Sequence, residues 1–298
     1  AGCTSHDVVA RLRRIYGLRR VGHAGTLDPD ATGVLLVGLG RATRLLRFLT
    51  ETGKVYRGEV AFGVATDTLD AAGAETARAP MPAATADALL DVVPRFVGTI
   101  AQIPPMVSAI KVDGVRLHER ARQGEVVERA PRTVRIDRIE IESFSPGDFP
   151  RAQILVECGS GTYIRSLAAD LGEALGGCAH LAWLRRLRVG PFPVEEARTL
   201  EEIAEGPEKA LLPMVEAVRH LPRIDVDGET ARGVSHGAVF PVTALCGSIT
   251  PPAAAAGSDP AADQNLGPLA VVGPDGRLLA LYERGRAAAR PLVVLAGG

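Results

Sequence analysis

The sequence predicts an α+β protein with a small β-rich domain at its C-terminal end, and two observations support this fold class. Residues 54–63, 134–143 and 151–158 have the length and side-chain pattern of strands, and helical stretches separate and follow them. Near Leu221 the pattern changes to a series of short strands. We therefore predict a large domain at residues 1–219 and a small β-rich domain at residues 220–298.

Helices are expected where apolar residues recur every three or four positions. The first begins after Thr4 or Ser5, either of which can cap it, with Val8, Val9 and Leu12 on one face and arginines on the other. Further helices are predicted at residues 42–50, 85–96, 180–187, 200–204 and 210–218 and within 159–176, and short strands of the second domain at 224–226, 238–242, 269–272, 278–282 and 291–295.

Two segments fit neither pattern. Residues 103–132 mix prolines, basic residues and a short helical stretch, which predicts a segment that projects from the domain. Residues 250–268 are rich in Ala, Pro, Gly, Ser and Asp, a composition that predicts a flexible loop.

The composition supports a sizeable core but gives no whole-chain signal for nucleic-acid binding. Hydrophobic residues make up 46% of the 298 residues, and the net charge is −1. Arginines are concentrated instead on both sides of residues 21–39; they are Arg11, Arg13, Arg14, Arg19 and Arg20 before it and Arg41, Arg44 and Arg47 after it. This concentration is a candidate nucleic-acid surface, and a solvated helix face is an equally good interpretation.

The four cysteines, Cys3, Cys158, Cys178 and Cys246, are scattered, with no CxxC pair and no histidine at ligand spacing. This spacing argues against a structural zinc site and against a disulfide framework, and it favours a reducing cytoplasm. The sequence has no apolar run long enough to span a bilayer and no signal-peptide pattern at its start. We therefore expect a cytoplasmic protein that does not associate with membranes.

Residues 21–39, VGHAGTLDPDATGVLLVGL, combine a turn-rich first half with an apolar second half. Glycines and Pro29 predict a tight loop, and residues 34–39 predict a buried strand or the start of a buried helix. A loop that closes onto a rigid element can hold one acidic side chain in a fixed place, and here that side chain is Asp28. A lone aspartate in such a loop is more commonly only a turn residue.

The complete string GHAGTLDPDATGVLLVGLGRATR resembles the catalytic loop of pseudouridine synthases of the TruB type. The resemblance runs from about residue 4 to residue 187 and includes, in the family's order, KVYRG, TDTLDAAG, IPPMVSAIK, ARQG, GTYIR and LRRL. Each short string is weak evidence, and the ordered set is strong. One departure is at the start, where the family has a strand ending in Lys-Pro that is missing here.

The resemblance implies the fold, the reaction and the substrate. The fold would be a mixed, mostly antiparallel sheet flanked by helices, with a C-terminal β domain, often of the RNA-binding PUA type. The reaction would convert uridine 55 in the T loop of tRNA to pseudouridine. It breaks the bond between N1 and the sugar, turns the base and forms a bond to C5, so it consumes no cofactor and needs no metal. The expected partner is the T arm of tRNA, with no obligatory protein partner.

This chemistry needs an ionised carboxylate, a neighbour that keeps it ionised and a means of extracting the base from its stack. By resemblance the carboxylate is Asp28, and Arg165 pairs with it and fixes its direction. Whether Asp28 attacks the sugar, attacks the base or removes a sugar proton stays open. Asp28 and Asp30 could also form a glycosidase-like pair, although the family string singles out Asp28.

The resemblance assigns roles to further residues, each of which also has a simpler interpretation. Tyr56 would stack on the target uracil and accept its proton late in the reaction, but it could be an ordinary strand aromatic. His23 would hold the flipped nucleotide, or it could be a turn histidine. Asp70 would join the polar network around the arginine. Tyr163 and Leu184 would line the pocket, and core packing would explain both equally well.

Residues 103–132 resemble the family's mobile insertion over the T loop. Basic residues there, Arg120 and Arg122 among them, would contact phosphates and make the affinity salt-dependent. A charged surface helix is the simpler interpretation of any one of them. Two other functions remain open for the whole chain: a guide-RNA-dependent synthase, which would need protein and RNA partners, and a tRNA-binding or tRNA-folding factor without catalysis.

Overall fold

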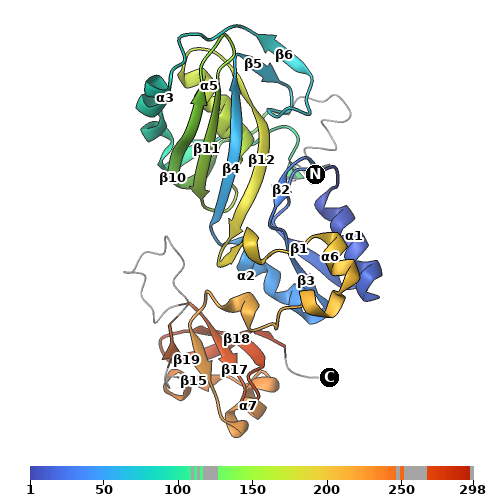
Figure 1. Ribbon diagram of the computed structural model, residues 1–298. Coiled ribbons are helices and arrows are strands. Elements are labelled where there is room, and N and C mark those ends of the chain that lie inside the picture. Colours follow the sequence, from blue (N-terminus) through green and yellow to red (C-terminus); the bar gives the residue numbers. More distant parts are fainter. Residues whose placement is uncertain (109–110, 113–114, 117–126, 246–248, 252–266, 296–298) are drawn as a thin grey trace. The chain divides into compact units, whose positions relative to one another are not determined.

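The computed structural model describes residues 1–108, 111–112, 115–116, 127–245, 249–251 and 267–295 (Figure 1). The chain forms two compact units. The first comprises Ala1–Gly2, Asp28–Val34 and Thr52–Arg188; the second comprises Cys3–Leu27, Leu35–Glu51 and Val189–Gly298. The boundary at residues 219 and 220 stays a prediction. In the described ranges, no helix is long and apolar enough to cross a membrane.

A mixed, mostly antiparallel sheet forms the centre of the first unit. Its strands are β4 (Lys54–Phe62), β7 (Gly98–Gln102), β10 (Arg132–Ser145), β11 (Arg151–Cys158) and β12 (Ala179–Val189), in the order β12-β4-β11-β10-β7. The pairs β4–β11, β11–β10 and β10–β7 are antiparallel, and the short β2 (Thr32–Gly33) pairs parallel with β12. This confirms the predicted fold class.

Two helices cover one face of this sheet. Leu89 of α3 (Ala86–Val92) and Leu167 and Leu171 of α5 (Ile164–Ala174) pack into one core with strand residues such as Val60 and Ile154, all fully buried. Because successive side chains of a strand point to opposite faces, the residues between these core positions face away from the helices. They form ion pairs such as Arg151–Glu59 between the neighbouring strands β11 and β4, and Arg57–Glu142 between β4 and β10.

The helix predicted at residues 180–187 is wrong, because this segment is strand β12. Leu181, Leu184 and Leu187 recur every three residues and so imitate a helical period. The tertiary setting decides otherwise: the segment lies between β4 and β2 and pairs with both. This correction changes which side chains share a face near the site.

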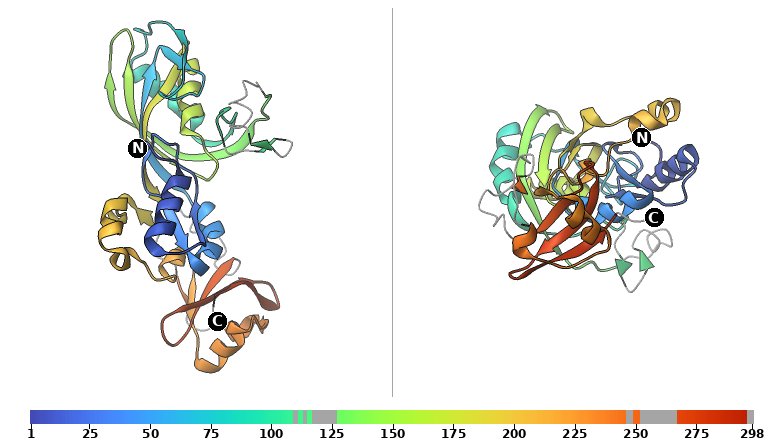
Figure 2. Two further views of the ribbon diagram at one scale, coloured as in Figure 1. Left: turned by 90° about the vertical axis from the view of Figure 1, so that its right-hand side faces the viewer. Right: turned by 90° about the horizontal axis from the view of Figure 1, so that it is seen from below.

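Two hairpins extend from the first unit. One joins β5 (Val64–Thr66) to β6 (Glu75–Arg78) through the turn that contains TDTLDAAG. The other joins β8 (Lys111–Val112) to β9 (Val115–Arg116) and lies to the side of the sheet in Figure 2. Arg120 and Arg122, which the sequence assigned to RNA contacts, lie outside the described residues.

The second unit begins with α1 (Ser5–Tyr16), the amphipathic helix that the sequence predicted. Thr4 caps it in a capping box with Asp7, and Gly17 ends it in the left-handed conformation. Val9 and Leu12 pack against Val21 of β1 (Val21–Ala24), which pairs antiparallel with β3 (Leu36–Leu39). The 3-10 turn Gly40–Leu45 leads into α2 (Leu46–Thr50), and α6 (Leu200–Glu205) follows later.

A six-stranded sheet forms the small C-terminal β domain. In the described residues its order is β15-β19-β18-β17-β14-β16. The strands are β14 (Arg223–Asp225), β15 (Phe240–Pro241), β16 (Ile249–Thr250), β17 (Pro268–Val272), β18 (Leu278–Arg284) and β19 (Ala288–Val294). The β-rich prediction is confirmed. The sequence did not predict α7 (Gly228–Ser235), which Asp227 caps.

The remaining short elements are β13 (Phe192–Pro193) and the 3-10 turns Val93–Phe96, Val194–Glu196, Pro207–Ala210, Glu216–Val218 and Val242–Leu245. The helix predicted at residues 210–218 is wrong, because residues 211–215 are irregular and only Glu216–Val218 forms a 3-10 turn; Pro213 interrupts the segment.

Candidate active site

Asp28 lies on the loop that leads into β2, and close backbone contacts fix this loop. Gly33 pairs with Arg186 of β12, and the amide of Val34 donates to the Arg186 carbonyl at 2.9 Å. Gly33 has a φ of 103°, and a Cβ atom there would lie 2.0 Å from that same carbonyl oxygen. Only glycine fits this approach. The glycine of the ATG string therefore anchors the end of the loop that carries Asp28.

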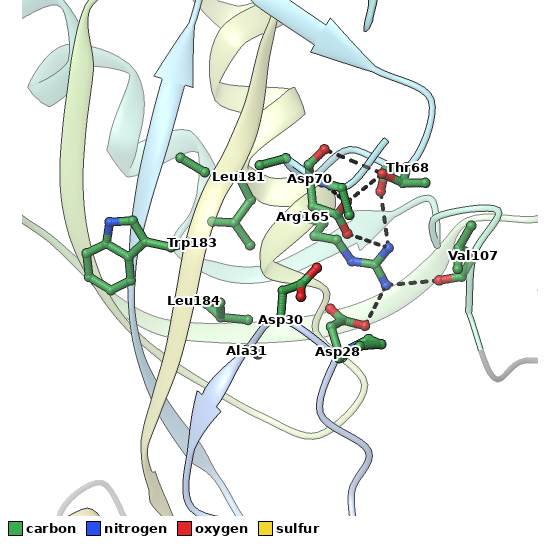
Figure 3. Close-up of a pocket in the computed structure, with 14 residues that line it drawn as sticks. Asp28, Asp30, Ala31, Thr68, Asp70, Val107, Arg165, Leu181, Trp183 and Leu184 are labelled. Atoms are coloured by element: carbon green, nitrogen blue, oxygen red, sulfur yellow. Dashed lines mark hydrogen bonds and ion pairs between the residues drawn. The ribbon is translucent and has the colours of Figure 1, made fainter. Parts of the chain in front are cut away.

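Arg165 holds the carboxylate of Asp28. It lies in the first turn of α5 and is only 4% exposed, and its Nη2 donates to Asp28 Oδ1 at 2.9 Å and to the Val107 carbonyl at 2.9 Å (Figure 3). Its Nη1 donates to the Thr68 carbonyl at 3.1 Å and lies 3.3 Å from Asp70 Oδ2. The guanidinium is thus fixed by contacts from three separate loops.

The turn between β5 and β6 supplies two of those contacts. Leu69 has a φ of 62°, the only positive value of a non-glycine residue in the described part of the chain. A non-glycine residue in this conformation is uncommon, so the surrounding contacts must impose it. The Leu69 carbonyl accepts from the Leu181 amide of β12 at 3.0 Å, and the Thr68 hydroxyl donates to Asp70. This docking directs the Thr68 carbonyl and the Asp70 carboxylate toward Arg165.

Burial and charge act in opposite directions on Asp28. Burial raises the pKa of its carboxyl above the ordinary value, and the negative charge of Asp70 adds to this effect. The guanidinium of Arg165 lowers the pKa, but by less than burial raises it. From Arg165 alone, a lowered pKa of Asp28 would be expected. The side chain keeps 38% of its surface exposed, so a substrate can reach it.

A pocket of about 340 Å³ opens beside Asp28. Its lining combines Asp28, Asp30, Asp70 and Arg165 with apolar side chains, including Val107, Leu181, Trp183 and Leu184. Asp30 is an exposed turn residue, as the sequence suggested, but it also lines the pocket. A fixed polar group beside an apolar wall is typical of a site that orients a flat, partly apolar ligand.

The two expected tyrosines are not among the residues that line this pocket. Tyr56 lies on β4 with only 9% of its surface exposed. Tyr163 precedes α5, and Gln102 holds its backbone by two hydrogen bonds of 3.0 and 2.8 Å. Burial raises the pKa of both phenols.

His23 belongs to the second unit. It lies on β1, where its ring contacts the ring of His6 edge-on at a centroid distance of 5.8 Å. The structure thus brings together three of the predicted site residues, Asp28, Asp70 and Arg165, with Leu184 in the same pocket.

The sequence did not single out Arg186. Read as a strand, residues 184–186 place Leu184 and Arg186 on the same face, so the wrong helix prediction concealed this residue. Its charge lowers the pKa of Asp28 and of Tyr56, and with burial it lowers the pKa of Lys54 to about 8. Among the described residues, no group of three or more His, Cys, Asp or Glu side chains could hold a metal ion.

The sheet, the flanking helices and this carboxylate–arginine pair define the class of the protein as a pseudouridine synthase fold, and comparisons with known proteins give the family. Residues 13–164 match the model of the TruB family pseudouridylate synthase N-terminal domain, and residues 165–219 match the tRNA pseudouridylate synthase B C-terminal domain. The chain belongs to the TruB family of pseudouridylate synthases, and it is therefore an isomerase.

Relatives and solved structures agree with this family. A protein of Thermobifida fusca named tRNA pseudouridine synthase B is 45% identical over 100% of this chain and 96% of its own length. One of the same name from Symbiobacterium thermophilum is 50% identical over 79% of each chain. A crystal structure titled as a Cbf5-Nop10-Gar1 complex is similar with a TM-score of 0.70 and 29% identity, over 98% of this chain and 80% of that one.

Proposed function

We propose that this isomerase converts uridine 55 in the T loop of tRNA to pseudouridine, with Asp28 as the reacting carboxylate. The observation that supports this most is the Asp28 carboxylate, held at 2.9 Å by a buried arginine at the edge of a pocket with an apolar wall. The relatives named tRNA pseudouridine synthase B support tRNA as the substrate. The family string around Asp28 supports the position in the T loop.

The contacts of Asp28 suit a group that reacts repeatedly without leaving its place. Arg165 contacts one carboxylate oxygen, Oδ1, in the free protein. The other oxygen can then face the nucleotide and act as nucleophile or base while the ion pair holds the side chain. Asp70 and the Thr68 carbonyl hold the arginine in turn, so its direction does not depend on the substrate.

The remaining residues take supporting roles in this proposal. Leu184 and the apolar lining contact the faces and edges of the flipped uracil. Tyr56 stacks on the base and accepts a proton late in the reaction, and Tyr163, which does not line the pocket in the free protein, contacts the nucleotide in the complex. His23 holds the flipped nucleotide in the complex. Arg120 and Arg122 contact phosphates of the T arm, and the cytoplasm is the proposed compartment.

The guide-RNA-dependent alternative has weaker support. A solved structure titled as an H/ACA RNP bound to a substrate RNA containing 2'-deoxyuridine is 26% identical to this chain. The relatives named tRNA pseudouridine synthase B are 44–50% identical over most or all of the chain. The higher identity favours an enzyme that acts on tRNA without a guide.

Tritium release tests this function. The purified protein is incubated with a tRNA transcript that carries uridine labelled with tritium at C5, and a transcript with cytidine at position 55 serves as the control. We expect release of one tritium per tRNA from the first transcript and none that depends on the enzyme from the second. Equal release from both transcripts would contradict position 55, and no release from either would contradict tRNA as the substrate.

The part of the tRNA that is recognised can be tested separately. A base in a structured loop must be unstacked at a cost of roughly a few kcal/mol, and RNA loops are recognised by shape, phosphates and splayed bases. We therefore expect an isolated T-arm stem-loop to react, and the same loop sequence without its stem to react far more slowly. Single-turnover rates at saturating enzyme measure the difference, and similar rates would contradict recognition of loop shape.

A further inference from the structure

The β5–β6 hairpin supplies two of the contacts that hold Arg165, and strand β12 fixes the tip of this hairpin. The Leu181 amide donates to the Leu69 carbonyl at 3.0 Å, and the Ala71 amide donates to the Leu181 carbonyl at 3.0 Å. Asp70 lies between these two bonds and pairs in parallel with Leu181. Backbone hydrogen bonds on both sides of Asp70 therefore hold the tip of the hairpin to β12.

The root of the same hairpin is held at Gly63 and Val64. The Gly63 amide donates to the Cys178 carbonyl at 2.7 Å. One residue further on, the Val64 carbonyl lies 2.9 Å from Nδ1 of His180, a half-buried side chain of β12. At the root, a side chain thus adds to the backbone contact, and it comes from the residue directly before Leu181.

This contact defines the position of a proton on the His180 ring. A carbonyl oxygen only accepts hydrogen bonds, so Nδ1 must carry a proton to bind the Val64 carbonyl. The neutral ring meets this condition in its Nδ1–H tautomer, and the protonated ring meets it as well. The bond is therefore compatible with either charge of the ring, and it acts as a fixed link between β12 and β5.

Hydrogen bonds connect the root of the hairpin with the groups at its tip. Thr66, at the end of β5, is 6% exposed, and its hydroxyl donates to the Asp70 carbonyl at 2.7 Å. The Thr68 carbonyl accepts from Arg165, and the Asp70 carboxylate lies 3.3 Å from the same guanidinium (Figure 3). A shift at the root would consequently reach the groups that direct Arg165 and, through it, Asp28.

We propose that His180 is a positioning residue for the isomerisation: its Nδ1–H holds the root of the hairpin on β12 and so keeps Thr68 and Asp70 against Arg165. This inference rests on the proposed function, because the direction of Arg165 affects the rate only if Asp28 reacts. Among the described residues, the lining of the pocket beside Asp28 does not include His180. Its loss should therefore lower the rate and leave the affinity for tRNA nearly unchanged.

Three substitutions separate the hydrogen bond from the bulk of the ring. In His180→Asn, the amide nitrogen lies as many bonds from the backbone as Nδ1 and can donate to Val64. In His180→Gln, the amide nitrogen takes the place of Nε2 instead, and His180→Ala removes every donor. The readouts are the single-turnover rate of tritium release at saturating enzyme and the binding of tRNA by filter retention.

We expect His180→Ala and His180→Gln to slow the reaction about tenfold, since a lost hydrogen bond and a small displacement of the reacting groups act together. His180→Asn should stay within about twofold of the parent rate, and all three variants within about twofold of the parent affinity. Parent rates in all three, or equal slowing by Asn and Gln, would overturn the proposal. A loss of affinity as large as the loss of rate would make His180 an RNA contact and would overturn it too.

His236→Ala is the matched control. Nδ1 of His236 contacts the Arg232 carbonyl at 2.7 Å, which is the same kind of bond, but in α7 of the small β domain. We expect this variant to keep the parent rate, and a tenfold slowing would overturn the proposal. Circular dichroism establishes that each variant is folded. If His180→Ala does not fold, the comparison of His180→Asn with His180→Gln still decides the outcome.

A second measurement does not depend on turnover. Hydrogen exchange followed by mass spectrometry reports on the amides of residues 69–74, which include the Ala71 amide bound to Leu181. We expect faster exchange of this segment in His180→Ala and His180→Gln and parent exchange in His180→Asn. Unchanged exchange in His180→Ala would overturn the proposal. Inactivity of the parent enzyme on every tRNA would contradict the proposed function instead, and the exchange would still decide whether His180 holds the hairpin.

Discussion

Arginines in the two units bind different acceptors. In the first unit, Arg165 is 4% exposed and contacts the carboxylates of Asp28 and Asp70. In the second unit, Arg41 and Arg47 are exposed and donate to the carbonyls of Leu295 and Leu292, at the end of the chain that the structure describes. Arg44 donates to the carbonyl of Val294 in the same strand segment.

The difference shows how the surroundings of an arginine determine what it contributes. A buried guanidinium beside carboxylates controls their direction and charge state, so its loss should affect the reaction. An exposed guanidinium that binds carbonyls secures a strand, so its loss should affect stability. The hydrogen bonds of Arg41, Arg44 and Arg47 to carbonyls fit this second role, and the nucleic-acid surface suggested by the sequence stays a prediction.

Arg165→Lys should have the largest effect of the variants that test this comparison. The charge remains, but a single nitrogen cannot hold Asp28, the Thr68 carbonyl and the Val107 carbonyl together. We expect the single-turnover rate to fall by about 10²- to 10³-fold, the range for breaking a buried ion pair. Binding of tRNA, measured by filter retention, should weaken much less. Equal losses of rate and affinity would make Arg165 an RNA contact.

A double variant, Arg120→Ala with Arg122→Ala, extends the comparison to the arginines that we propose contact RNA phosphates. If both contact phosphates, the affinity for tRNA should fall about tenfold at moderate salt, and the slope of log K against log salt should decrease by about one to two. The single-turnover rate at saturating enzyme should stay at the parent value. An unchanged slope would show that these two side chains do not contact phosphates.

Arg41→Met should affect stability rather than turnover. Loss of its hydrogen bond to Leu295 should lower the free energy of unfolding by about 1 kcal/mol, measured by urea denaturation. Arg14→Met is the control, since its hydrogen bond is to Ala10 of its own helix and its loss should cost less than about 0.5 kcal/mol. A tenfold loss of single-turnover rate in Arg41→Met would contradict the division of roles between the units.

The smallest of these effects should be the pH dependence of the rate, because it leaves the rate at neutral pH almost unchanged. The reaction needs ionised Asp28, and burial raises the pKa of this carboxyl above its usual value of about 3.9. As the pH falls through the raised pKa, the carboxyl gains a proton and the rate decreases. The single-turnover rate should therefore begin to fall at a higher pH than an ordinary aspartate would give. A rate that stays constant down to about pH 4 would contradict the raised pKa.

The sequence predicted elements with strong local signals. Thr4 and the apolar face of the first helix, and the alternation of residues 54–63, correspond closely to α1 and β4. It failed where tertiary pairing overrides local spacing, as at β12. It also missed α7, whose sequence GETARGVS is short, polar and interrupted by glycine.

The site was predictable through its motifs but not through its geometry. Asp28 and Arg165 are 137 residues apart, so only their family strings suggested that they meet. The strings also named Asp70 and Leu184. They could not show that Asp30 and Trp183 line the same pocket, or that Arg186 is buried, because these facts depend on the register of β12 and on the packing of the loop.

The most direct test of the account is the reaction of Asp28→Asn with tRNA labelled at C5 of uridine 55 alone. The amide keeps the size of the side chain and loses its charge, so the reacting group disappears while few contacts change. We predict tritium release by the parent enzyme, a rate lower by about 10⁴-fold or more in Asp28→Asn, and tRNA affinity close to the parent value. Release by Asp28→Asn at near the parent rate would contradict the assignment of the reaction to this carboxylate.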